Sequence, residues 1–77
     1  MRISLHAKQR LLERVFEIED VYDKRSLSMA ADILNDNSFH LEDLGDQIVP
    51  LVGFKGVSIQ IRNNTVVTVL VNKRKMK

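Results

Sequence analysis

The stretch KGVSIQIRNNTVVTVLV, residues 55–71, decides the fold class of this chain. Apolar and polar side chains alternate through residues 57–62, and a second, β-branched run occupies residues 65–71, as is typical of half-buried strands. Asn63 and Asn64 separate the two runs, and asparagine tolerates the positive φ that a two-residue hairpin turn requires. The stretch therefore predicts a β-hairpin.

The two faces of this predicted hairpin differ in composition. Strict alternation places one set of side chains on the face that packs against helices: Val57, Ile59, Ile61, Val66, Thr68 and Leu70. The opposite face then receives Ser58, Gln60, Arg62, Val67, Val69, Val71 and Lys73. Three valines are unusual on a solvated face, so we expect another element or a partner to cover it. β-propensity alone is the alternative explanation of the valines.

Helical periodicity precedes the hairpin. Leu5, Leu12 and Phe16 fall on one stripe, which predicts a first helix over residues 5–16, with Ser4 as its N-cap. The next segment, residues 17–37, reads as a second helix or as two short ones.

The remaining segments complete a small sheet. Pro50 lies in a short apolar run, which places that run at a sheet edge or at the start of a strand. Residues 1–4 are long enough only for a short leading strand. We therefore predict an α+β domain with two or three N-terminal helices packed on one face of a small antiparallel sheet of three to four strands. The domain spans residues 1–77, and residues 72–77 form a frayed basic tail.

Charge is divided into three blocks along the chain. Residues 1–16 carry four basic side chains and one acidic one, residues 17–46 carry two basic and nine acidic ones, and residues 47–77 carry six basic and none acidic. If the two ends of the chain meet in space, they form one basic surface, and the acidic segment faces away from it.

Composition argues against several classes of protein and site. The chain has no cysteine, which removes disulfides and thiolate metal sites and fits a reducing, cytoplasmic location. No apolar run approaches the ~18–20 residues of a membrane span, so no membrane contact is expected. His6 and His40 form no metal-ligand pattern, and the glycines match no nucleotide-binding loop, so no metal or cofactor is expected.

What remains is metal-free phosphodiester chemistry or simple binding. RNA can be cut by its own 2′-hydroxyl, which needs a proton acceptor, a proton donor and cations for the charge that develops around phosphorus. Histidine suits the proton transfers and arginine suits the phosphate. His6, Arg10 and Arg14, with Arg62 from the predicted sheet, could compose such a set. The simpler interpretation is a surface histidine on a solvated, basic helix face.

Two stretches of the chain, residues 4–21 and 55–71, resemble a family of small bacterial and phage domains similar to the RelE and BrnT toxin ribonucleases. The residues that match its N-terminal signature are His6, Ala7, Arg10, Glu13, Arg14, Asp20 and Val21. Those that match its C-terminal signature are Lys55, Gly56, Val67, Thr68 and Val69. Val15 and Phe16 depart from the signature, which has Gly-Ile there.

This resemblance implies a RelE/BrnT-like fold, with catalytic roles for His6, Arg10 and Arg62. It implies phosphate contacts from five basic residues: Lys8, Arg14, Lys73, Arg74 and Lys75. RNA, a cognate antitoxin or a host protein are the partners it implies.

Three functional hypotheses follow. The first is a RelE-like, metal-independent ribonuclease-type toxin, or a phage-borne relative, acting on RNA. The second is a non-catalytic phage or mobile-element accessory protein that binds a host protein through its acidic residues 17–46 or its valine-rich sheet face, a face that would also serve a homodimer. The third is a nucleic-acid binder that uses its basic ends and whose affinity falls steeply with salt.

Overall fold

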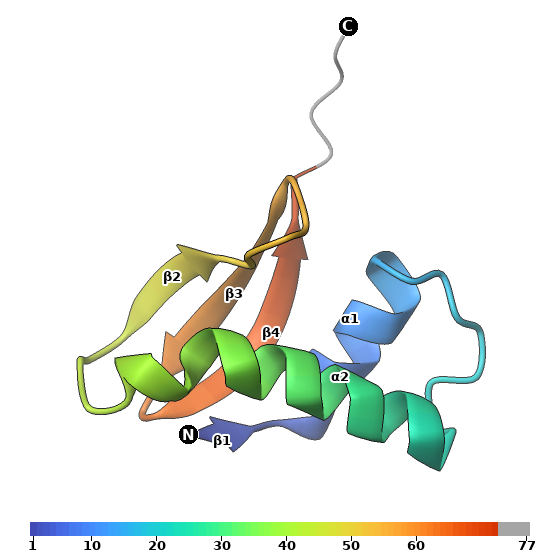
Figure 1. Ribbon diagram of the computed structural model, residues 1–77, viewed down its shortest axis with the longest axis horizontal. Coiled ribbons are helices and arrows are strands. Elements are labelled where there is room, and N and C mark those ends of the chain that lie inside the picture. The colour runs from blue at the N-terminus through green and yellow to red at the C-terminus, as the bar shows by residue number, and fades with distance from the viewer. Residues whose placement is uncertain (73–77) are drawn as a thin grey trace, which may run out of the picture.

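The computed structural model describes residues 1–72, which form an α+β fold with two α-helices and a four-stranded sheet (Figure 1). The elements in chain order are β1 Arg2–Ile3, α1 Leu5–Arg14, α2 Lys24–Ser38, the 3-10 turn η1 Phe39–Leu41, β2 Gln47–Pro50, β3 Val57–Arg62 and β4 Thr65–Val71. The predicted α+β class is confirmed. Most of the predicted tail, residues 73–77, lies outside the described part of the chain.

The sheet is mixed, which corrects the prediction of a purely antiparallel one. Its strand order is β1-β4-β3-β2, and the β2–β3 and β3–β4 pairs are antiparallel, whereas β1 runs parallel to β4. Parallel pairing is available to β1 because both helices lie between it and the rest of the sheet in the sequence, which leaves ample chain for the crossover. The first and last strands of the fold are therefore neighbours.

Local side-chain contacts set the helix boundaries. The Ser4 hydroxyl accepts a hydrogen bond from the Ala7 N–H at 3.0 Å, so the predicted N-cap is confirmed. Helix α1 ends at Arg14 rather than at residue 16, and the chain turns at Glu17, whose φ is 55°. Asp23 caps α2, which is therefore a single helix that begins later than predicted.

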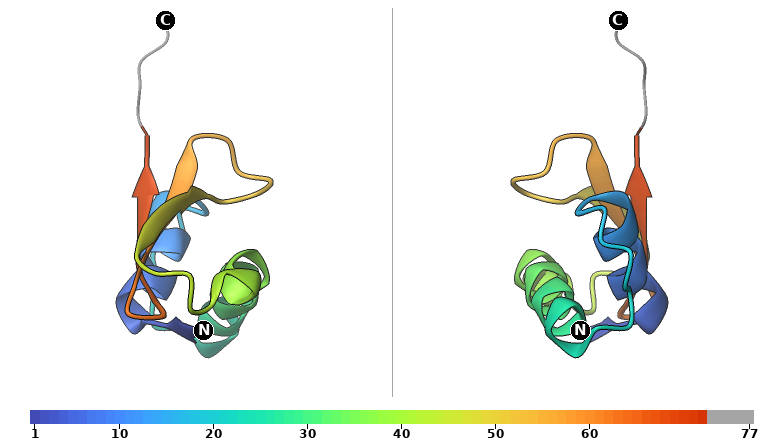
Figure 2. Two further views of the ribbon diagram at one scale, coloured as in Figure 1. Left: turned by 90° about the vertical axis from the view of Figure 1, so that its left-hand side faces the viewer. Right: turned by 90° about the vertical axis from the view of Figure 1, so that its right-hand side faces the viewer.

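Both helices and the sheet contribute to one hydrophobic core. Its buried members are Ala7, Leu11, Leu12, Ala30, Leu34, Leu51, Val57, Ile59, Ile61, Val66 and Val69. Leu5, predicted to lie on the core stripe, is instead 50% exposed because α1 turns Ala7 and Leu11 inward. Figures 1 and 2 show α2 across one face of the sheet and α1 beside β4, beyond the end of β1.

A β-bulge in β4 decides which of its side chains face the core. Gln60 pairs with Thr68, but the next residue, Ile61, pairs with Val66, so Val67 is an extra residue in β4. One extra residue inverts the alternation along the rest of a strand. Val69 is accordingly 2% exposed and Leu70 is 40% exposed, the reverse of the predicted assignment.

The predicted valine-rich face is therefore wrong. Val69 is part of the core and Val71 packs against it, so the bulge removes two of the three valines from the opposite face. That opposite face, called here the outer sheet face, consists of Arg2, Ile48, Pro50, Ser58, Gln60, Arg62, Thr65, Thr68 and Leu70. It is more polar than strict alternation predicts.

Candidate functional site

Three side chains on successive turns of α1 form a connected row, called here the α1 row. Arg10 Nε donates to His6 Nε2 at 3.3 Å, and Arg10 Nη1 contacts Glu13 Oε1 at 3.2 Å in an ion pair. These spacings of four and three residues place the groups on one helix face. The charge of Arg10 is thus balanced by Glu13. A neutral His6 that accepts at Nε2 carries its proton on Nδ1.

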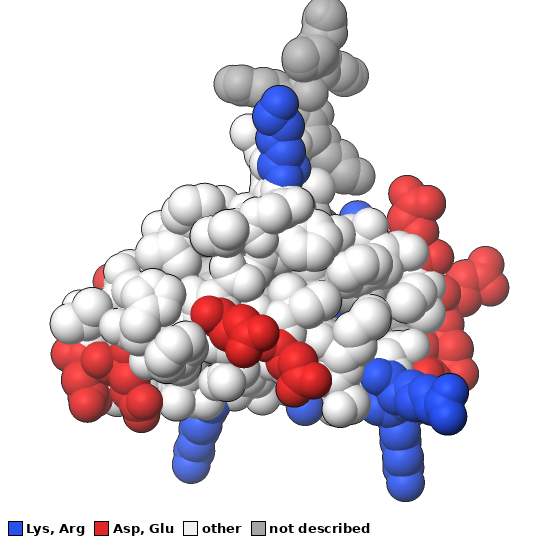
Figure 3. Space-filling view, viewed as in Figure 1, with Lys and Arg blue, Asp and Glu red and all other residues white. Residues whose placement is uncertain are grey.

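The α1 row lines a cavity of about 610 Å³ beside the loop that follows α1. The residues around it are His6, Gln9, Arg10, Glu13, Glu17, Ile18, Glu19 and Val21. Three glutamates face one arginine, so acidic side chains outnumber basic ones around this cavity. In Figure 3, acidic side chains gather at the right-hand edge, over the α1–α2 connection. A negative lining repels phosphates, so this cavity is a poor site for RNA backbone.

Arg62 belongs to a different row on the outer sheet face. It pairs with Thr65 of β4, which pairs in turn with Arg2 of β1. Neighbours across strands share a face, so Arg2, Thr65 and Arg62 form one line, the arginine row, in which the two arginine Cα atoms are roughly 10 Å apart. Both arginines are exposed, and neither has an ion-pair partner within residues 1–72.

The structure brings His6 and Arg10 together but does not add Arg62 to them. Among the described residues, no hydrogen bond, ion pair or shared cavity joins Arg62 to the α1 row. Arg62 instead lines a separate cavity of about 370 Å³, together with Asp46 and with Gln47 and Ile48 of β2. The three predicted catalytic residues are therefore divided between two surfaces.

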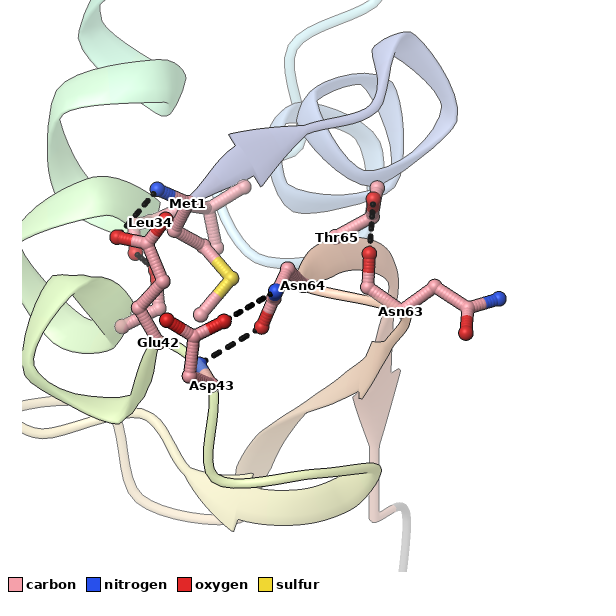
Figure 4. Close-up of polar contacts among 8 residues, drawn as sticks. Met1, Leu34, Glu42, Asp43, Asn63, Asn64 and Thr65 are labelled. Atoms are coloured by element: carbon pink, nitrogen blue, oxygen red, sulfur yellow. Dashed lines mark hydrogen bonds and ion pairs between the residues drawn. The ribbon is translucent and has the colours of Figure 1, made fainter.

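The turn beside Arg62 is held by the acidic segment. Asn63 and Asn64 have φ of 51° and 57°, which confirms the predicted two-residue turn. The Asp43 N–H donates to Asn64 Oδ1, and Asn64 Nδ2 donates to Asp43 Oδ1, both at 2.8 Å (Figure 4). The Asn63 N–H donates to Asp46 Oδ1 at 3.0 Å. Sequence reasoning missed these contacts, because only the fold brings residues 43–46 to the turn.

The prediction that the acidic segment faces away from the basic ends is therefore wrong for part of that segment. Glu42 Oε1 lies 3.2 Å from the Met1 amino group, and Asp43 contacts Asn64 of the hairpin turn (Figure 4). Asp46 accepts the Asn63 N–H of the same turn. The physical reason is that backbone N–H donors and an ammonium group need acceptors, and these carboxylates supply them. The two ends do meet, because β1 lies beside β4.

The other predicted site residues contribute less. Lys8 is half-buried on α1 and Arg14 is exposed in its last turn, whereas Lys73, Arg74 and Lys75 lie outside the described residues. Within residues 1–72, no three histidine, aspartate or glutamate side chains lie close enough together to hold a metal ion. No helix in this part of the chain is both long and apolar enough to cross a membrane.

Comparison with protein families, curated proteins and solved structures gives no significant match to this chain. The geometry of the two surfaces is therefore what points to a function.

Proposed function

We propose that this protein acts on RNA through its outer sheet face, as a RelE-like, metal-independent ribonuclease-type toxin or a phage-borne relative. The observation that carries the proposal is the arginine row. Arg2 and Arg62 are exposed and have no carboxylate partner within residues 1–72. Two guanidinium groups on one face, about 10 Å apart at their Cα atoms, suit neighbouring phosphates of a single strand.

The neighbouring rows of the outer sheet face favour contacts with the RNA backbone. Gln60 and Thr68 pair beside the arginine row, and Ser58 and Leu70 pair beyond them. Amide and hydroxyl groups of this kind bind phosphate and sugar oxygens, which fix the position of a strand without reading its bases. Aromatic side chains make up only 5% of the chain and none belongs to this face, so base stacking contributes little. Binding is therefore expected to depend strongly on salt.

Cleavage requires one further step at the α1 row. The RNA 2′-hydroxyl must lose a proton before its oxygen attacks phosphorus, and His6 is the side chain suited to that transfer near neutral pH. Arg10 donates to the Nε2 that would accept the proton. That hydrogen bond has to open, and RNA has to extend from the outer sheet face to His6 at the start of α1, with its phosphates kept outside the cavity that the glutamates line.

The test measures cleavage of single-stranded RNA in the presence of EDTA, together with growth arrest on expression. We expect the wild type to cut, His6→Ala to bind without cutting, and Arg62→Ala to bind weakly. Wild-type binding without cleavage would reduce the proposal to an RNA-binding protein. Neither binding nor cleavage by the wild type would refute it.

The negatively charged cavity favours a second candidate, the non-catalytic binding of a host protein or cognate antitoxin. Glu17 and Glu19 have no ion-pair partner within residues 1–72, and Ile18 and Val21 add apolar lining. This combination suits a lysine or arginine side chain of a partner. The Glu17→Gln/Glu19→Gln variant should lose that partner and keep RNA affinity, whereas Arg62→Ala should do the opposite.

A further inference from the structure

Among residues 1–72, strand β2 is the outermost strand of the sheet, and one of its edges has no neighbouring strand in this part of the chain (Figures 1 and 2). The Leu51 N–H donates to the Val57 carbonyl at 2.8 Å, so Leu51 and Val57 are a hydrogen-bonded pair of the β2–β3 ladder. In an antiparallel pair, residues that exchange hydrogen bonds alternate with residues that do not. Through the register, Val49 therefore directs its backbone groups toward β3, and Ile48 and Pro50 direct theirs away from it.

The open edge of β2 has an available donor and acceptor at Ile48. This residue is 59% exposed, and its N–H and C=O both lie on the edge. Pro50 offers only a C=O there, which is the position where a strand tolerates proline. An unpaired edge is a template for another strand, and the β2 sequence QIVP has no charge to discourage pairing.

We propose that β2 pairs with β2 of a second copy of this chain, antiparallel, about a twofold axis at Ile48. The two copies of Ile48 then exchange a pair of backbone hydrogen bonds. Pro50 lies opposite position 46 of the partner, so its missing N–H leaves one hydrogen bond unmade and does not prevent pairing. The result is one continuous sheet across the dimer.

The spacing of exposed apolar residues favours a second copy over an unrelated strand. Leu44 and Val52 are 65% and 79% exposed, and they lie at equal distances in sequence on either side of Ile48. Both residues lie just outside β2, so a twofold axis at Ile48 places Leu44 of each copy and Val52 of the other at the same end of the paired strands. A surface that is complementary to itself in this way is the requirement of a symmetric interface.

Charge does not oppose this arrangement. Asp46 is the acidic residue next to β2, and it already accepts the Asn63 N–H at 3.0 Å. In the proposed register the two Asp46 residues are separated by about 13 Å along the strands, which exceeds the ~8–10 Å over which charges interact at physiological ionic strength. The short edge buries less than a standard interface, so the dimer forms only at high protein concentration.

The test compares Ile48→Pro with Ile48→Val by analytical ultracentrifugation from about 10 μM to about 1 mM, the range of weak dimers. Proline removes the N–H on the open edge without removing a bond to β3, whereas valine keeps it. We expect the wild type and Ile48→Val to dimerise as concentration rises, and Ile48→Pro to do so at least about tenfold more weakly, because the dimer loses two backbone bonds. A wild type that stays monomeric, or equal dimerisation of the two variants, would overturn the proposal.

Hydrogen exchange of the wild type gives an independent readout if Ile48→Pro fails to fold. The Ile48 amide should become protected as concentration rises. The Val52 amide should not change, because it already donates to Asn37 Oδ1 at 2.9 Å. Exchange at Ile48 that is independent of concentration would contradict the dimer.

Discussion

Arg10 and Arg62 are the same residue type in opposite surroundings. Arg10, on a helix, has His6 and Glu13 within one turn and contacts both. Arg62, on a strand, has neighbours chosen by the sheet register, and its row ends in a second exposed arginine, Arg2. On a helix, a carboxylate three residues away can balance the charge of an arginine. In a sheet, strand pairing can bring unpaired arginines from distant parts of the chain onto one face.

This difference separates the two candidate surfaces by charge. The cavity beside α1 carries three glutamates and one arginine, whereas the strands of the outer sheet face carry two arginines, and Asp46 is the one carboxylate that lines the cavity at Arg62. A phosphate is attracted to the second surface and repelled by the first.

The largest expected effect concerns which residues form the outer sheet face. Val69→Ala should lower the free energy of unfolding by about 2 kcal/mol, because it deletes buried methyl groups and leaves a cavity. Leu70→Ala, one residue further on, should cost less than about 1 kcal/mol because Leu70 is partly exposed. Urea unfolding of both variants measures the difference. Equal losses would mean that the bulge does not set the faces of β4.

The arginine row should provide most of the RNA affinity. The Arg2→Ala/Arg62→Ala variant should bind single-stranded RNA at least about tenfold more weakly, because charge-assisted contacts to two phosphates are lost. The slope of log K against log salt should decrease by about 1.4, at ~0.7 per phosphate on a single strand. Fluorescence anisotropy over a salt series measures both quantities.

Arg10 supplies the matched control for that experiment. Arg10→Ala should change RNA affinity by less than about twofold, because Glu13 already balances its charge. Glu13→Gln should raise the affinity slightly, because it leaves Arg10 without its carboxylate partner. If Arg10→Ala weakens binding as much as the double variant, RNA binds at α1 and the contrast is wrong.

The hydrogen bonds between Asp43 and Asn64, which hold the hairpin turn, should contribute less to stability. Asp43→Ala should lower the free energy of unfolding by about 1 kcal/mol, because the side chain of Asn64 loses its acceptor. Asp43→Asn should lose less, because its amide oxygen still accepts and asparagine tolerates the φ of 66° at this position. Thermal unfolding distinguishes the variants. Melting temperatures of both variants equal to that of the wild type would show that the turn does not need the contacts between Asp43 and Asn64.

The smallest effect is a dependence on pH at the start of α2. The Ser26 N–H and then its hydroxyl donate to Asp23, and they lower the pKa of Asp23 below its ordinary value of 3.8. The stabilisation is therefore present above the ordinary pKa and is lost as pH falls through the lowered one. Asp23→Asn caps without titrating, so its melting temperature should fall less than that of the wild type from about pH 5 to about pH 2. Equal decreases in the melting temperatures of Asp23→Asn and the wild type over this pH range would contradict a titrating cap at Asp23.

Local signals predicted the parts of this fold that depend on nearby residues. The hairpin, its Asn63-Asn64 turn, the Ser4 cap and the edge position of Pro50 all follow from short-range chemistry. The bulge at Val67 did not, because alternating β-branched residues fit either phase of a strand and only packing against the core selects one.

The candidate site was harder to predict for the same reason. His6 and Arg10 meet because they are four residues apart on a helix, a relation that the sequence displays directly. Arg2 was not among the predicted site residues, because its position beside Thr65 and Arg62 depends on long-range strand pairing. A basic residue close to the start of a short leading strand is the one signal that pointed toward it.

An NMR titration of the amide resonances with single-stranded RNA at low salt tests directly whether RNA binds at the arginine row. We expect the largest shift changes at Arg2, Arg62 and Thr65, with smaller changes at Gln60 and Thr68. Changes confined to α1 and the loop that follows it would show that RNA binds at the carboxylate-lined cavity, and they would contradict the account.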